Sequence, residues 1–161
     1  MKKNQKGFSL IELLIVVVII GIIAAIAIPN LLAARRAANE GSAVSSMRTL
    51  HGANVTYQST AGNGTFAASL PALNTAGLID TVFASATAST SAKSGYFYTY
   101  ATVAGPPSTF TTVAAPATGT GVTATGTRAF FIDESGVMRV EVGAAGAAPA
   151  TPTVASAPLN N

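Results

Sequence analysis

The sequence has few of the groups that enzymes and nucleic-acid-binding proteins commonly use. Its 161 residues include no cysteine and one histidine, and only 9% of them are charged. No disulfide can form, and the redox compartment cannot be inferred from cysteine usage. Alanine, threonine, glycine and serine are abundant instead. This composition suits a closely packed protein outside the cytoplasm better than a cytosolic enzyme.

The positive charge of the chain is concentrated at its start. The formal net charge is +3, and Lys2, Lys3 and Lys6 lie within the first six residues. Removing these residues would leave six basic and six acidic side chains and therefore no net charge. A basic surface for nucleic acid would not survive the removal, so no nucleic-acid binding is predicted.

One long apolar segment follows this basic leader. Residues 13–28 (LLIVVVIIGIIAAIAI) carry no charge, and one acid, Glu12, lies at the entrance to the run. In a secretory signal the charged region precedes the apolar region, and the cleavage site comes last. Here the natural cleavage point, between Gly7 and Phe8, precedes the apolar run. Cleavage there would remove the lysines and keep the apolar segment in the mature chain.

The stretch KGFSLIELLIVVVIIGIIAAIAIPN resembles the N-terminus of type IV pilins and of the related pseudopilins of type II secretion. The resemblance implies that a prepilin peptidase cuts after Gly7 and that the new N-terminal residue, Phe8, is then methylated. It also implies that Glu12 is the acid of the fifth mature position. Gly21 and Pro29 match positions where the helix loosens during assembly. The disulfide that closes a C-terminal loop in many pilins is absent from this chain.

The position of Glu12 also has a physical interpretation. A carboxylate inside a membrane helix costs about 2.5–3.5 kcal/mol at mid-span and less near an end, so it is usually kept because it has a partner. Cleavage after Gly7 would create an amine at Phe8, one helical turn or about 6 Å away. That amine could pair with Glu12 of its own chain or of a neighbour displaced along a shared axis. Pairing with a neighbour would neutralise the acid and fix the axial step between subunits.

Two other interpretations of this segment remain. Residues 25–27 (Ala-Ile-Ala) resemble a small-residue cleavage site, so residues 1–27 could be a removable signal peptide. Against this, Glu12 interrupts the apolar region, which is about as long as signal peptides allow. Residues 13–28 could also be a plain anchor, although the run is short of the ~20 residues that a span needs.

The sequence predicts four regions: a cleaved leader (1–7), a hydrophobic transmembrane and filament-core helix (8–34), a globular head (35–142) and a low-complexity tail (143–161). The tail contains Ala, Pro, Gly and Thr without periodicity, so little order is expected in it. The lysines of the leader favour a cytoplasmic N-terminus, which would place the head outside.

One long helix is predicted from Phe8 to about Ser59. In its second half, side chains at three- to four-residue spacing form an amphipathic stripe: Val44, Met47, Leu50, Asn54 and Tyr57. Strong turn signals in residues 61–64 end this helix. A short helical turn is expected over residues 69–77, and the Ser/Thr/Ala-rich residues 84–94 are expected to form a loop.

Four antiparallel strands are predicted in the second half of the chain, over residues 96–102, 109–114, 128–132 and 137–142. Asp133–Gly136 is a hairpin signal in which glycine supplies the positive φ. The predicted core contains large side chains of the helix and the last two strands: Met47, Leu50, Phe130, Ile132, Met138 and Val140. Helix, loop and antiparallel sheet is also the pilin layout. The predicted fold class is therefore α+β and pilin-like, with one long N-terminal helix packed on a four-stranded antiparallel sheet.

Candidate catalytic and ligand-binding residues are few. His51 has no acid at helical spacing, so a position facing the sheet or solvent is favoured over metal ligation or general-base work. Asp133 and Glu134 could bind calcium, as C-terminal regions of some pseudopilins do, but a turn acid is favoured because calcium needs six or more oxygens. Asn63–Thr65 fits a glycosylation sequon. No catalytic residue, cofactor or metal site is predicted, and the chain is predicted not to be an enzyme.

The resemblance and the physical argument together predict a structural subunit (pilin) of a type IV pilus. The subunit would span the inner membrane once before assembly and lie in a surface filament afterwards. Its expected partners are copies of itself, the prepilin peptidase, the assembly machinery and the membrane. One alternative is a major pseudopilin of type II secretion, although the expected stretch rich in acidic and Tyr-Pro residues is not evident. Another is a secreted or anchored adhesive module that binds through its tyrosines or Thr-rich loops.

Overall fold

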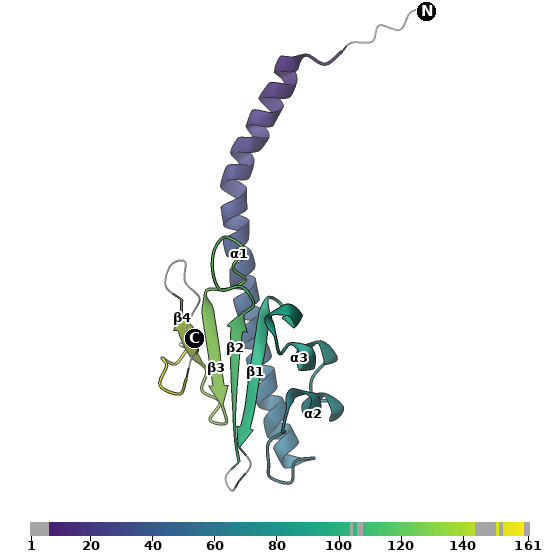
Figure 1. Ribbon diagram of the computed structural model, residues 1–161, viewed down its shortest axis with the longest axis vertical. Helices are drawn as coiled ribbons and strands as arrows, with labels where there is room; N and C mark the ends of the chain where they lie inside the picture. The colour runs from purple at the N-terminus through teal and green to yellow at the C-terminus, as the bar shows by residue number, and fades with distance from the viewer. Residues whose placement is uncertain (1–6, 104, 106–107, 144–150, 152, 160–161) are drawn as a thin grey trace, which may run out of the picture. The chain divides into compact units, whose positions relative to one another are not determined.

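The computed structural model describes residues 7–103, 105, 108–143, 151 and 153–159, so the leader lysines lie outside the described residues. The chain divides into two compact units, Met1–Ala34 and Arg35–Asn161. The elements follow in the order α1 (Leu10–Ser59), α2 (Leu70–Thr75), α3 (Thr81–Ser85), the 3-10 helix η1 (Ser89–Ser91), β1 (Tyr96–Val103), β2 (Thr109–Pro116), β3 (Arg128–Asp133) and β4 (Arg139–Val142) (Figure 1).

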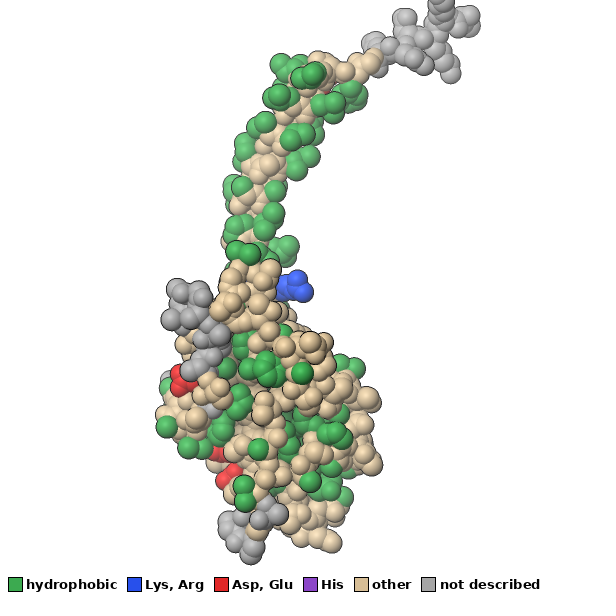
Figure 2. Space-filling view, viewed as in Figure 1, with side chains coloured by type: hydrophobic (Ala, Val, Ile, Leu, Met, Phe, Trp, Pro, Cys, Tyr) green, Lys and Arg blue, Asp and Glu red, His purple; other side chains and the backbone are tan. Residues whose placement is uncertain are grey.

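The first unit consists largely of the apolar part of α1. Every large apolar side chain from Leu10 to Ile28 is between 48% and 80% exposed. Figure 2 shows hydrophobic side chains along this part of the helix. Among the described residues, α1 is the one helix that is long and apolar enough to cross a membrane. Exposing an apolar surface of this size to water is unfavourable, so the helix needs lipid or other helices around it.

The second half of α1 packs on the sheet through its amphipathic stripe. Met47, Leu50 and Asn54 are buried, and Val44 and Tyr57 are partly buried against the same core. The predicted stripe is therefore confirmed.

The four strands form one antiparallel sheet in the order β1-β2-β3-β4, each strand pairing with the next along the chain. Phe130 and Ile132 of β3 are buried in the cluster that also holds Met138, Met47 and Leu50, and Val140 packs against it. The predicted core is confirmed, as is the α+β, pilin-like arrangement of one long helix and a four-stranded antiparallel sheet. Gly136 in the last hairpin has a φ of 74°, as the turn requires.

Three expectations need correction. Residues 84–94 do not form a simple loop, because α3 continues to Ser85 and η1 follows. Asp80 caps α3 by accepting a hydrogen bond from the N–H of Phe83 at 2.5 Å, and the Phe83 ring packs on that of Tyr98.

The last strand begins at residue 139, two residues later than expected. In the tail, residues 157–159 bind β4, so the expectation of little order is wrong for this part.

Candidate functional site

The predicted cleavage point lies in open, non-helical backbone. Gly7 and Phe8 precede α1, which begins at Leu10. The Phe8 side chain is 79% exposed. No heavy atom outside the neighbouring residues lies within 4 Å of the position that a Cβ on Gly7 would take. Gly7 and Phe8 are thus both exposed, and cleavage between them stays a prediction.

Glu12 is held by the first turn of its own helix. Its Oε2 accepts a hydrogen bond from the backbone N–H of Ser9 at 2.8 Å. An acid at the third position of a helix that reaches back in this way is half of a capping box, and its negative charge also suits a helix N-terminus. The residues Ser9-Leu-Ile-Glu12 are the sequence signature of this cap, a signal that the predictions above leave out. The uncut chain has no Phe8 amine, so the pairing of Phe8 with Glu12 stays a prediction.

Gly21 and Pro29 both lie inside continuous helix. No atom within 4 Å would oppose a Cβ on Gly21. Pro29 has no N–H, so it cannot donate to the carbonyl four residues earlier, and the side-chain amide of Asn30 donates to the carbonyl of Ile26 at 3.0 Å. The helix is intrinsically weaker here, and its loosening during assembly stays a prediction.

A buried carboxylate joins α1 to the start of β3. Glu40 is 5% exposed. Its Oε1 accepts hydrogen bonds from the N–H and Oγ1 of Thr127 at 2.8 and 2.9 Å, and its Oε2 accepts one from Nε of Arg128 at 2.7 Å. Burial raises the pKa of Glu40, but these hydrogen bonds and the positive charge of Arg128 outweigh it, so the pKa lies below its ordinary value.

The loop between β2 and β3 is held by two more side chains of α1. Nε of Arg36 donates to the carbonyl of Ala124 at 3.1 Å, and its Nη2 donates to the carbonyls of Gly121 and Val122, both at 3.0 Å. Asn39 donates to a further carbonyl of this loop, that of residue 125, at 2.9 Å. Together with Glu40, these residues fix the Thr/Gly-rich loop on the helix.

The tyrosines of β1 face the helix. Tyr96 donates a hydrogen bond to the carbonyl of Arg128 at 2.7 Å, and Tyr98 is buried. Tyr100 donates to Oδ1 of Asn54 at 2.7 Å, and burial raises the pKa of Tyr100 to about 12. These side chains belong to the core, which argues against a ligand platform made of tyrosines.

The other candidate groups are satisfied within the head. His51 lies 3.4 Å from the carbonyl of Glu134 through its Nε2, and its ring packs against that of Phe110. Oδ1 of Asp133 accepts hydrogen bonds from the N–H and Oγ of Ser135, so it serves the turn. Within the part of the chain that the structure describes, no three His, Cys, Asp or Glu side chains group as metal ligands would.

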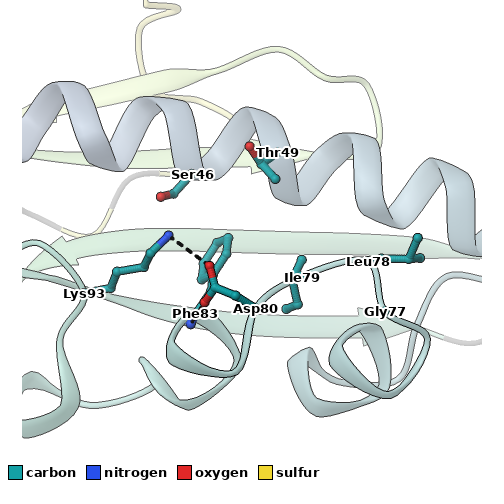
Figure 3. Close-up of a pocket in the computed structure, with 8 residues that line it drawn as sticks. All are labelled: Ser46, Thr49, Gly77, Leu78, Ile79, Asp80, Phe83 and Lys93. Atoms are coloured by element: carbon teal, nitrogen blue, oxygen red, sulfur yellow. Dashed lines mark hydrogen bonds and ion pairs between the residues drawn. The ribbon is translucent and has the colours of Figure 1, made fainter.

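A cavity of about 430 Å³ lies between α1 and the segment that contains α3 (Figure 3). Lys93 and Asp80 form an ion pair of 3.7 Å beside it, and the ammonium of Lys93 lies 4.8 Å from the centre of the Phe83 ring. The two charges neutralise each other, and both are partly exposed. The arrangement presents no nucleophile paired with a base.

Comparison with known proteins finds one family motif and several relatives that match part of the chain. Residues 2–28 match the family model of the prokaryotic N-terminal methylation motif. The chain is 68% identical to the type IV wide pilus major component PilA4 of Thermus thermophilus over 38 residues, which are 24% of this chain and 29% of that protein. It is 56% identical to the type IV major fimbrial protein FimA of Dichelobacter nodosus over 52 residues, 30% of this chain and 33% of that protein.

A second group of relatives belongs to secretion systems. The chain is 39% identical to the type II secretion system core protein G of Aeromonas hydrophila over 57 residues, which cover 35% of this chain and 40% of that protein. All these matches therefore span well under half the length of the relatives. No solved structure matches the chain significantly. The chain thus carries the prokaryotic N-terminal methylation motif, is similar over part of its length to type IV pilus and type II secretion proteins, and has a pilin-like α+β fold.

Proposed function

We propose that the chain is a structural subunit (pilin) of a type IV pilus. The observation that carries the proposal is the methylation motif at residues 2–28, which coincides with the part of α1 whose large apolar side chains, from Leu10 to Ile28, are all exposed in the single chain. Each Å² of apolar surface removed from water contributes roughly 25 cal/mol, so this surface needs lipid or other helices around it. The membrane would supply lipid around this surface before assembly, and a bundle of like helices in the filament would surround it afterwards.

Processing would come first. A prepilin peptidase cuts the bond between Gly7 and Phe8, and Phe8 is then methylated at its new amine. The precursor spans the inner membrane once, with its lysine-containing leader in the cytoplasm and the head outside. Cleavage removes three lysines and leaves the mature chain with no net charge.

Polymerisation would then use Glu12. Lipid and a helix bundle are similarly apolar, so the choice of partner must come from packing and from polar pairs. In the uncut chain the Glu12 carboxylate accepts one hydrogen bond from Ser9. Its remaining lone pairs are open to a second donor. The Phe8 amine of a neighbouring subunit supplies one and places that subunit at a fixed axial step.

The second candidate is a major pseudopilin of type II secretion, which the similarity to core protein G supports. Both candidates predict the same cut and the same methylated Phe8, but only a pilus forms long surface fibres. A secreted or anchored adhesive module would instead be cut at residue 27 or left uncut.

The test is to identify the N-terminus of the mature protein by mass spectrometry and to shear the cell surface. We expect a methylated Phe8, and filaments in the sheared fraction that disappear when the coding sequence is deleted. In a Gly7→Val variant we expect the full-length chain to accumulate in the membrane. A mature chain that starts at Ile28 would contradict the proposal, and so would cells whose surface yields no filaments.

A further inference from the structure

The outer edge of β4 is covered by the C-terminal end of the chain. The N–H of Val140 donates to the carbonyl of Ala157 at 2.9 Å, and the N–H of Leu159 donates to the carbonyl of Met138 at 2.7 Å. We call residues 153–159 the C-terminal strap. Without it, these backbone groups of the sheet edge would lack partners, and open edges readily pair with other chains.

The strap also ends the sheet. The two bonds flank a bridge between Arg139 and Pro158. In an antiparallel pair of this kind, the backbone N and O of the two facing residues point away from each other. The nitrogen of Pro158 therefore faces outward and carries no hydrogen, so a further strand finds no donor at this position.

Side chains hold the strap in one register. Nη1 of Arg139 donates to the carbonyl of Ser156 at 3.1 Å. Ser156 is 7% exposed, and its Oγ accepts a hydrogen bond from the N–H of Thr153 at 2.9 Å. The side chain of Leu159 packs against the core cluster. The β4 edge is thus a site that recognises this particular segment by backbone pairing, one carbonyl and one apolar side chain.

The link between β4 and the strap would allow the strap to reach another copy. Residues 143–152 read GAAGAAPATP and contain no charge. Ten residues can span up to about 33 Å when extended. The strap would make the same contacts on a second copy as on its own chain. The exchange would therefore cost little free energy apart from that of extending the linker. A strap tethered to its own head has an effective concentration in the mM range. In a filament, its effective concentration at the β4 edge of a neighbouring head would be similar.

We propose that the β4 edge is an interaction site for a second copy of this chain, and that its occupant there is the strap of that copy. The proposal rests on the proposed function, because it requires heads held side by side in a filament. In the single subunit each strap closes its own β4. In the filament a fraction of the straps crosses to neighbouring heads and ties them together.

The test uses two introduced thiols, since the chain has no cysteine of its own. Facing residues in such a pair have Cα atoms about 4.5 Å apart, within the range of a disulfide. The variant Arg139→Cys with Pro158→Cys is expressed as the only copy and oxidised, and its membrane and sheared-surface fractions are run on non-reducing gels. We expect internally bonded monomers in the membrane and a ladder of covalent multimers in the sheared filaments.

The control is Arg139→Cys with Thr151→Cys, because Thr151 is exposed and lies outside the strap. We expect a severalfold smaller share of multimers from it. An equal ladder from the control, or internally bonded monomers alone in the filaments, would overturn the exchange. Thiols that stay free in both fractions would overturn the site itself. If wild-type cells yield no sheared filaments, the proposed function fails, and the membrane fraction still shows whether the strap closes β4.

Discussion

Side chains of α1 bind partners at two very different separations along the sequence. The residues that join α1 to the sheet have distant partners, whereas those of the N-terminal motif have near ones. Glu40, Arg36 and Asn39 bind groups that lie 85 to 88 positions further along the chain. Helical spacing relates only residues a few positions apart, so no pattern in the sequence predicts these pairs. Glu12 and Ser9 are three positions apart, and their cap could have been predicted from the sequence alone.

Replacing Glu40 should destabilise the head in a way that depends on pH. We expect Glu40→Gln to cost about 1–3 kcal/mol at neutral pH, because charge-assisted hydrogen bonds to Thr127 and Arg128 are weakened. The pKa of Glu40 is lower in the folded than in the unfolded chain. Its stabilisation is therefore present above the unfolded pKa, and it is lost as the pH falls through the folded value. Thermal unfolding of the full chain in detergent, followed by tyrosine circular dichroism, measures both effects.

The control for this prediction is Glu134→Gln, since the Glu134 side chain is exposed. We expect it to leave the unfolding temperature and its acid dependence close to those of wild type. If Glu40→Gln loses as much stability as wild type on acidification below about pH 4, the carboxylate does not carry the effect.

Among the elements, those with a long periodic pattern could be predicted, whereas the short ones depend on tertiary contacts. The second half of α1 has a stripe of side chains at three- to four-residue spacing, and burial along β1 and β2 largely alternates with a period of two residues. The five-residue α3 has no such pattern, and it is fixed by the Asp80 cap and by the burial of Phe83 against Tyr98. The C-terminal strap likewise takes its conformation from the β4 edge, so composition alone suggested little order.

The turn into β3 requires glycine at position 126. A Cβ at this position would overlap the Tyr96 hydroxyl. That hydroxyl donates to the carbonyl of Arg128, so its displacement would also break a hydrogen bond. We expect Gly126→Ala to cost about 1–3 kcal/mol in the free energy of unfolding, measured in denaturant.

A matched substitution separates this clash from the general effect of losing a glycine. Gly52 lies on α1 with no atom near the position of a Cβ. Gly52→Ala should be neutral or stabilise the head by about 0.5–1 kcal/mol, because alanine favours helix. Equal effects from the two variants would show that the Tyr96 contact does not matter.

The face of the sheet that packs on α1 should carry most of the stability of the head. Phe130 is fully buried between β3 and the helix. We expect Phe130→Ala to cost about 3–5 kcal/mol, because it leaves a cavity in the core. Thermal unfolding gives the change, with Phe97→Ala, a half-buried position of β1, as the control. An unchanged melting temperature for Phe130→Ala would show that this face is not the core.

At the scale of the whole molecule, the two units need different surroundings. The first unit exposes apolar side chains from Leu10 to Ile28, whereas the second buries its own core. Changes in the first unit should therefore affect insertion and assembly and leave the folding of the head unchanged. The composition of the sequence predicts an uncharged apolar segment at residues 13–28, and the exposure of these side chains agrees with it. Composition could not supply the contacts between copies, since those depend on surfaces that no local pattern describes.

Glu12 tests this separation most directly. Glu12→Val lengthens the apolar run, so membrane insertion should be unchanged or easier, and a plain anchor would tolerate the change. A filament subunit would instead lose the pairing of its carboxylate with a neighbouring Phe8 amine. We expect normal levels in the membrane fraction, slow or poor methylation of Phe8, and few or no filaments in the sheared fraction when the variant is the only copy.

Glu12→Gln distinguishes the charge of Glu12 from its role as a helix cap. Glutamine can still accept the hydrogen bond from Ser9, as it does in capping boxes, but it carries no charge. If the ion pair drives assembly, Glu12→Gln should lose filaments almost as completely as Glu12→Val. If the cap is what matters, Glu12→Gln should retain them, because the first turn of α1 stays closed. Wild-type amounts of sheared filament from both variants would contradict any role of Glu12 in recruiting subunits.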